Sequence, residues 1–230
     1  MRPYARQSGT PPTRTFAPAA LLLGLGCLGL TGGSWGATLT VTVLMPDGHP
    51  LSGVIVTAHP SAGPAHAAEP LAAVMDQVDR AFAPDLLVVP VGSTVAFPNS
   101  DSVSHQIYSF SPAKRFQLPL YRGKPYPPVV FDQPGVVTMG CNIHDEMLAY
   151  IVITDASFFG RTNAAGSWSA DVPGGGYRIS IWHPRIRDDA KDLGGELTVS
   201  EPNGATLTLR LTKQLKPAPL EGRPHSWDTY

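Results

Sequence analysis

The sequence predicts an all-β protein built from short strands joined by tight turns. Its 230 residues include 24 Pro and 23 Gly, the two residue types that most often interrupt regular structure and occupy turns. No long apolar stripe recurs with the helical period of 3.6, whereas several short segments alternate apolar and polar side chains as half-buried strands do. We therefore expect one large or two small β domains.

Residues 1–36 have the organisation of a secretory signal peptide. Three Arg residues precede an apolar run of 12 residues (19–30), and small residues follow it as far as Ala37. The run is shorter than the roughly 20 residues that a membrane-spanning helix needs. We expect cleavage near Ala37, a periplasmic location and no transmembrane segment in the mature form. Lipidation at Cys27 is the rival interpretation, and the residues before it match that motif poorly.

Cleavage would leave 14 Lys and Arg against 18 Asp and Glu, a formal charge of −4. A chain with this balance is not built to bind nucleic acid. Cleavage would also leave Cys141 as the one cysteine, with no internal disulfide partner in an oxidising compartment. A lone cysteine is usually a buried, inert side chain. Here its neighbours favour metal coordination, which holds the thiolate and shields it from exchange.

The mature chain begins with a strand, a turn and a second strand. Residues 38–44 alternate with period 2, the turn Pro46-Asp47-Gly48 follows, and residues 54–57 resume the β pattern. The pattern predicts a strand, a turn and a strand within residues 37–60. Residues 61–71 have no apolar period and are predicted to be a linker.

The next unit, residues 72–155, contains several short β-branched or apolar runs separated by turns. A stretch rich in Pro, 113–128, is predicted to be a long surface loop. The predicted strands are residues 73–77, 86–90, 93–97, 129–131, 135–139 and 150–153.

Three candidate metal ligands fall within seven positions, in the pattern Cys141-x2-His144-x2-Met147. A thiolate, an imidazole and a thioether can converge from one such loop onto a single ion. Cys and Met select Cu(I), imidazole suits both oxidation states of copper, and a His2Cys set with a weak axial Met is typical of electron-transfer copper sites. The loop supplies one His, so a second is required. His105, which follows a strand-like run and a turn, is the candidate.

These residues resemble the cupredoxins, with a ligand loop closest to amicyanin and a region similar to the plastocyanin-like proteins associated with methylamine utilisation. The likeness covers roughly residues 72–155, and it is carried by Phe97-x-Asn99, His105, Gly135 and the Cys141 to Met147 loop. It implies a Greek-key β-sandwich that binds one type 1 copper. The implied ligands are His105, Cys141, His144 and, weakly, Met147. Gln106 is a departure, because plastocyanins usually carry Asn after the first His.

The resemblance also implies residue roles and a function. Asn99 would tie the His105 strand to the Cys141 loop, and the exposed ring edge of His144 would pass the electron. The expected function is that of a non-enzymatic blue copper protein that carries single electrons between redox partners, such as a cytochrome c or a periplasmic dehydrogenase. Copper trafficking or storage, and a scaffold role for the flanking β segments, remain open as alternatives.

Residues 156–215 resemble the later half of a transthyretin-like or carboxypeptidase-regulatory-like sandwich, and residues 47–53 resemble its first hairpin. The cupredoxin-like unit would then be inserted into a second small β-sandwich built from residues 37–60 and 156–215. A single enlarged cupredoxin is the alternative. The Pro-containing tail, residues 216–230, is predicted to be unstructured.

The remaining ionisable residues have simpler interpretations. Asp145 and Glu146 are expected to face solvent, and the other histidines are expected to be solvated and to form no second metal site. In the 113–128 stretch, four basic residues alternate with aromatic ones, and we hypothesise that they help to dock a redox partner. The four basic residues are Lys114, Arg115, Arg122 and Lys124, and the other histidines are His49, His59, His66, His183 and His225.

Overall fold

The computed structural model describes residues 36–62, 67–123 and 126–218, and it is all-β, as predicted. The predicted signal peptide (apart from Gly36), most of the tail and residues 63–66 of the linker lie outside the described residues. No helix in the described ranges is long and apolar enough to cross a membrane. The elements in chain order are β1 (Ala37–Leu44), β2 (Ile55–Pro60), β3 (Ala72–Val74), β4 (Asp76–Val78), β5 (Ala81–Ala83), β6 (Leu86–Pro90), β7 (Ser93–Ala96), β8 (Ile107–Ser111), β9 (Lys114–Gln117), β10 (Val129–Phe131), β11 (Gly135–Cys141), β12 (Leu148–Thr154), β13 (Phe158–Arg161), β14 (Ser167–Val172), β15 (Gly175–Trp182), the 3-10 helix η1 (Ala190–Asp192), β16 (Gly194–Val199) and β17 (Ala205–Arg210).

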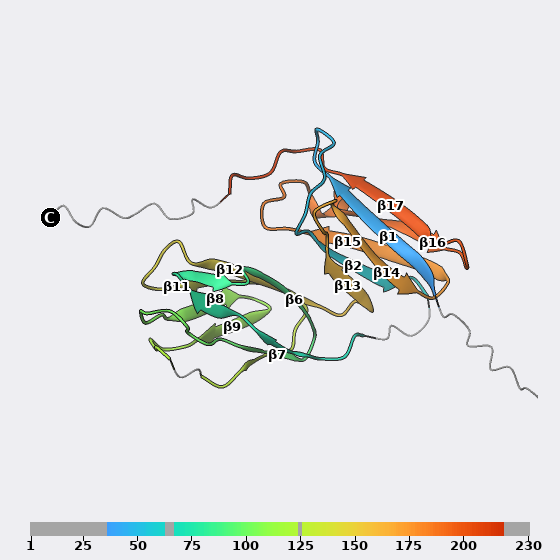
Figure 1. The fold of residues 1–230 in the computed structure, drawn as a ribbon. Coiled ribbons are helices and arrows are strands. Elements are labelled where there is room, and N and C mark those ends of the chain that lie inside the picture. The colour runs from blue at the N-terminus through green and yellow to red at the C-terminus, as the bar shows by residue number, and fades with distance from the viewer. Residues whose placement is uncertain (1–35, 63–66, 124–125, 219–230) are drawn as a thin grey trace, which may run out of the picture. The chain divides into compact units, whose positions relative to one another are not determined.

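Two sheets bring the beginning and the end of the described chain together. In the first, β1 lies between β14, which is antiparallel to it, and β17, which is parallel to it (Figure 1). In the second, the order is β13-β2-β15-β16. Alternate residues of β1, namely Leu39, Val41 and Val43, are fully buried, as the period-2 pattern predicts. They share one hydrophobic core with side chains of β2, β14 and β15.

A second core lies in the middle of the sequence. It is associated with a five-stranded sheet of order β6-β12-β11-β8-β9, most of whose strands are labelled in Figure 1. A three-stranded sheet of order β10-β7-β3 and the two-stranded hairpin β4-β5 belong to the same part of the chain. Phe97, Phe131 and Ile151 are among its largest buried side chains. Cys141 and Met147 belong to the same core, so the candidate ligand loop is anchored in it at both ends.

The two cores draw on different parts of the sequence. One is formed by residues between 37 and 58 and between 168 and 211, and the other by residues between 75 and 153. A third, small cluster contains Ile55, Leu86 and Val152. The predicted boundaries of the inserted unit, and the likeness of the flanking segments to transthyretin-like sandwiches, stay predictions.

The prediction of a loop throughout residues 113–128 is wrong at its beginning. Residues Lys114–Gln117 form β9, which pairs antiparallel with β8 from Ser111↔Lys114 to Tyr108↔Gln117. This segment contains no Pro, so its backbone can pair with a neighbour. β9 lies at the edge of the sheet, where charged residues such as Lys114 and Arg115 are common because they discourage pairing with another chain.

Truncation of Leu39 tests whether the two cores are energetically separate. Leu39→Ala should cost about 2–5 kcal/mol, since it empties space around a fully buried side chain. We expect hydrogen-exchange protection to fall for amides of β1, β2 and β15 and to stay unchanged for amides of β8, β11 and β12. Thr208→Ala, at an exposed position of β17, is the control. An equal loss of protection in both cores would support the single enlarged unit instead.

Candidate metal centre

The alternation of side chains along β11 places Cys141 in the core. Along this strand Val137, Met139 and Cys141 are buried, because side chains two residues apart share one face of the sheet. Cys141 is the last residue of β11 and pairs with Ile107, the first residue of β8. Its side chain is 3% exposed, so the thiol is shielded from solvent.

His105 reaches the same place from the neighbouring strand. It lies two residues before Ile107, and both side chains are buried, with His105 fully so. Its backbone is held by Tyr121, since the N–H of each residue donates to the carbonyl oxygen of the other at 3.0 Å. The segment before β8 is therefore fixed on both edges, by β11 at Ile107 and by Tyr121 at His105.

His144 and Met147 lie on the loop that closes the β11-β12 hairpin. Gly140 pairs with Leu148, so residues 141–147 span the closure. A turn forms where the Met147 N–H donates to the His144 carbonyl oxygen at 3.1 Å. Met147 is buried, whereas His144 is partly exposed, so His144 is the candidate ligand that reaches the surface.

Three donor atoms converge among these residues. The Nδ1 atoms of His105 and His144 lie 3.1 Å apart, and the Cys141 Sγ lies 3.7 Å from each of them. Within the described residues, these three form the group of His, Cys, Asp and Glu side chains whose ligand atoms could hold a metal ion. The structure thus brings His105 beside Cys141 and His144, and Met147 lies in the same core as Cys141.

The triangle has the size that a first-row transition metal requires. An ion about 2.0–2.1 Å from each imidazole nitrogen and about 2.3 Å from the sulfur would subtend roughly 100° between the two nitrogens and roughly 115° between nitrogen and sulfur. The second angle lies between the tetrahedral and trigonal values, and the first is about 10° below the tetrahedral value. The residues therefore fit a bound metal ion without a rearrangement of the backbone.

The electrostatic surroundings keep the imidazole of His144 available as a ligand. Burial lowers the pKa of His144 below its usual value, and the neighbouring His105 lowers it further. His144 therefore binds a proton less readily than a free histidine, which leaves its ring nitrogen lone pair available to a metal. Asp145 and Glu146 are exposed, as expected, and the charge of Glu146 partly offsets the lowered pKa of His144.

The second ring nitrogen of His105 lies beside a carboxylate that was not predicted from the sequence. His105 Nε2 lies 3.0 Å from the Asp101 Oδ2. The pKa of Asp101 is lowered to about 2, first by a hydrogen bond from the Arg80 N–H and then, against the opposing effect of burial, by His105. The only signal in the sequence is an acid four residues before a histidine, in a segment that resembles an ordinary turn.

The link between the two ligand segments is made by Gln106 and Asn142. The Asn142 N–H donates to the Gln106 carbonyl oxygen at 3.1 Å, and the Asn142 side-chain amide donates to Gln106 Oε1 at 3.2 Å. Each residue directly follows a candidate ligand, His105 or Cys141. Gln106, which departs from the usual plastocyanin residue, is therefore part of the support of the site.

Asn99 was expected to make this link, and its observed hydrogen bonds are different. Its side-chain amide donates to the carbonyl oxygens of Val103 and Tyr121, at 3.0 and 2.9 Å, and its Oδ1 accepts from the Asp101 N–H at 3.0 Å. These partners all belong to the His105 side of the site. Asn99 is buried and organises the turn before His105, and within the described residues the contact with the Cys141 loop is made by Gln106.

The remaining histidines are less uniform than expected. His49 is exposed, and His66 and His225 lie outside the described residues. His183 is partly buried, and burial lowers its pKa. His59 Nε2 lies 3.0 Å from Asp155 Oδ1. For His183 and His59, therefore, the expectation of a freely solvated ring is wrong.

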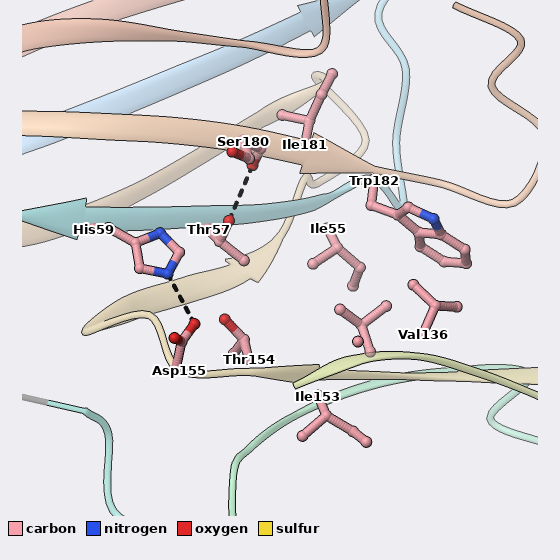
Figure 2. Close-up of a pocket in the computed structure, with 12 residues that line it drawn as sticks. Ile55, Thr57, His59, Val136, Ile153, Thr154, Asp155, Ser180, Ile181 and Trp182 are labelled. Carbon is pink, nitrogen blue, oxygen red and sulfur yellow. Dashed lines mark hydrogen bonds and ion pairs between the residues drawn. The ribbon is translucent and has the colours of Figure 1, made fainter. Parts of the chain in front are cut away.

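A cavity of about 240 Å³ lies beside the His59–Asp155 pair, lined by residues of β2, β11, β12 and β15 (Figure 2). Its walls include Ile55, Ile181 and Trp182, and its polar end carries the His59–Asp155 contact. None of the four candidate ligands lines it. The pair offers one imidazole and one carboxylate, fewer ligands than protein metal sites usually provide.

No family model and no curated protein matches the sequence. Solved structures with a similar fold include a purple cupredoxin of Nitrosopumilus maritimus, with 26% identity and a TM-score of 0.33 over 36% of this chain and 99% of that one. A copper-containing nitrite reductase of Thermus scotoductus matches with 30% identity and a TM-score of 0.35 over 42% of this chain and 25% of that one. A reduced amicyanin variant matches with 21% identity and a TM-score of 0.33 over 43% of this chain and 99% of that one. Because each match covers less than half of this chain, function has to be inferred from the residues of the site.

Removal of the Gln106–Asn142 contact tests its role in holding the site. Gln106→Ala should weaken copper binding about 2-fold to 10-fold, because one side-chain hydrogen bond contributes about 0.5–1.5 kcal/mol. Affinity is measured for Cu(I) by competition with a chelator. Asn142→Ala and the double variant complete a thermodynamic cycle. If the two single effects add without a coupling energy, the side chains do not support the site together.

Proposed function

We propose that this protein is a type 1 copper protein that carries single electrons between redox partners. The observation that carries the proposal is the triangle of His105 Nδ1, His144 Nδ1 and Cys141 Sγ, with separations of 3.1 to 3.7 Å. Two imidazoles and a thiolate are the strong ligands of such centres. A copper ion bound there would supply a one-electron couple, Cu(II)/Cu(I).

The composition of the donor set favours copper over zinc. Structural zinc sites usually complete a tetrahedron with four Cys or His ligands, and catalytic ones leave a position for water. Here the loop also offers a buried thioether, Met147, which belongs to the same core as Cys141. A thioether is a soft ligand suited to Cu(I), and in the axial position it binds weakly and tunes the potential. Met147 is therefore assigned as the fourth ligand.

The two histidines have different roles in this proposal. His105 is fully buried and anchors the ion, whereas His144 is partly exposed. An electron enters or leaves through the ring of His144, because it is the ligand closest to solvent. Ile143 beside it is 50% exposed, which provides an apolar surface on which a partner protein can exclude water during transfer.

We propose that the protein is exported to the periplasm, where its redox partner is a soluble cytochrome c or a periplasmic dehydrogenase. The predicted signal peptide and the single cysteine of the mature chain support this location. One of the similar structures is a nitrite reductase, which is an enzyme. That this chain carries electrons without catalysing a reaction is therefore itself part of the proposal.

Visible absorption and EPR spectra test the metal centre. Residues 37–230 with one equivalent of Cu(II) should show an intense thiolate-to-copper band and a narrow copper hyperfine splitting, because the Cys141 thiolate binds covalently. Cys141→Ser should abolish the band, and Met147→Leu should keep it while raising the reduction potential. A weakly absorbing complex that survives in Cys141→Ser would contradict electron transfer and favour copper trafficking or a scaffold role.

We infer further that exposed basic residues of the 113–128 stretch help to dock an acidic redox partner. Arg122 follows Tyr121, whose backbone pairs with His105, and Arg122 and Arg115 are both exposed. Lys114 is instead paired with Asp132, at 3.1 Å, and Lys124 lies outside the described residues. Arg115 and Arg122 are therefore the stronger candidates for partner contact.

Charge reversal at these two positions tests the docking surface. Arg115→Glu with Arg122→Glu should slow electron transfer to an acidic c-type cytochrome about 10-fold at low salt and reverse its salt dependence, because the attraction becomes repulsion. Stopped-flow kinetics at several ionic strengths measure both. Lys191→Glu makes the same type of charge change on η1 and is the control. Equal rates in all three proteins would sink the docking hypothesis.

A further inference from the structure

Asp101 lies on the far side of the His105 ring from the metal-facing atoms. His105 Nδ1 faces Cys141 and His144, and His105 Nε2 lies 3.0 Å from Asp101 Oδ2. The side chains of His105 and Asp101 are 0% and 8% exposed. A carboxylate therefore accepts a hydrogen bond from this imidazole out of contact with bulk water.

The carboxylate is itself held in place by its surroundings. Besides His105, Asp101 Oδ2 accepts the Arg80 N–H at 2.8 Å, and Asp101 Oδ1 accepts the Ser102 N–H at 2.6 Å. The Asp101 N–H donates to Asn99 Oδ1 at 3.0 Å. Three N–H groups thus fix the residue, and both oxygens are oriented before any metal binds.

The hairpin that presents the Arg80 N–H has an unfavourable backbone conformation. Asp79 and Arg80 have φ values of 52° and 58°, in the left-handed region that residues other than Gly occupy at an energetic cost. The same hairpin also holds the segment through Asp76, whose oxygens accept the Ser100 hydroxyl at 2.7 Å and the Ser100 N–H at 3.1 Å. Strain of this kind persists where the surrounding structure requires it, and here it directs a donor at Asp101.

A carboxylate in this position has two physical effects on the ring. It accepts the Nε2 proton, so the lone pair of a neutral His105 is on Nδ1, the atom that faces the metal site. It also makes the imidazole a stronger electron donor and adds a buried negative charge near the ion. The first effect prepares the ring for either oxidation state of copper, and the second favours Cu(II) over Cu(I).

We propose that Asp101 is the residue that orients His105 for metal binding and that its negative charge lowers the reduction potential of the bound copper. The proposal rests on the copper site proposed above and extends it to a group that does not touch the metal. Asp101 is accordingly a positioning residue, and its effect is transmitted through the His105 ring.

Asp101→Asn removes the negative charge of the side chain while nearly keeping its shape, so it tests the effect of the charge. Partners of this type change metal affinity by about 10–100-fold, so we expect Cu(II) affinity to fall by about that factor while Cu(I) affinity changes less. The reduction potential should then rise by about 59 mV for each tenfold difference between the two affinities. Asp76→Asn is the matched control, because it loosens the same segment at Ser100 without contact to His105. An equal rise in Asp76→Asn, or none in Asp101→Asn, would overturn the proposal.

A measurement on the metal-free wild-type chain keeps the proposal testable if a variant fails to fold. The ¹⁵N chemical shifts of His105 should show the proton on Nε2, and a proton on Nδ1 alone would overturn the orienting role. Failure of the copper site as a whole is recognised separately. In that case the wild-type protein lacks the type 1 spectrum, whereas failure of this inference alone leaves the spectrum intact and the potential of Asp101→Asn unchanged.

Discussion

Antiparallel pairing of β11 with its two neighbours is the constraint on which the metal centre depends. Pairing with β8 sets Cys141 opposite Ile107, and pairing with β12 sets Gly140 opposite Leu148. The first brings the His105 segment beside the cysteine, and the second closes the loop that carries His144. A slip of one residue would turn Cys141 to the outer face of the sheet. The register of these strands therefore sets the geometry of the candidate ligands.

The polar contacts around the candidate metal centre matter for stability because the groups that make them are buried. An unpaired buried polar group costs about 1–3 kcal/mol, and His105 is fully buried with a partner at each ring nitrogen. Asp101 holds its ring, and the Gln106–Asn142 contact holds its strand against the Cys141 loop. The candidate ligands are thus held in place by the protein itself, before any ion binds.

The strands were predictable wherever their apolar pattern was strong. Residues 129–131 coincide with β10, and residues 86–90 coincide with β6. β9 was missed because Lys114–Gln117 is polar and lies between prolines, and it forms only because β8 offers a free edge. In the site, Cys141 and His144 could be recognised because they are close in sequence, whereas Asp101 looked like an ordinary turn residue until its carboxylate was located beside His105.

The sequence by itself determined the all-β class, the contiguous Cys141-x2-His144-x2-Met147 loop and the alternation that turns Cys141 inward, because these depend only on neighbouring residues. The tertiary structure decided how distant groups meet that loop. His105, already the candidate from the sequence, is 36 residues from Cys141 in the chain, yet its Nδ1 lies 3.7 Å from the sulfur. Gln106, rather than Asn99, joins the two segments, and Asp101 completes the His105 environment. The reason is physical: strand pairing and side-chain packing, which act between remote residues, set these contacts.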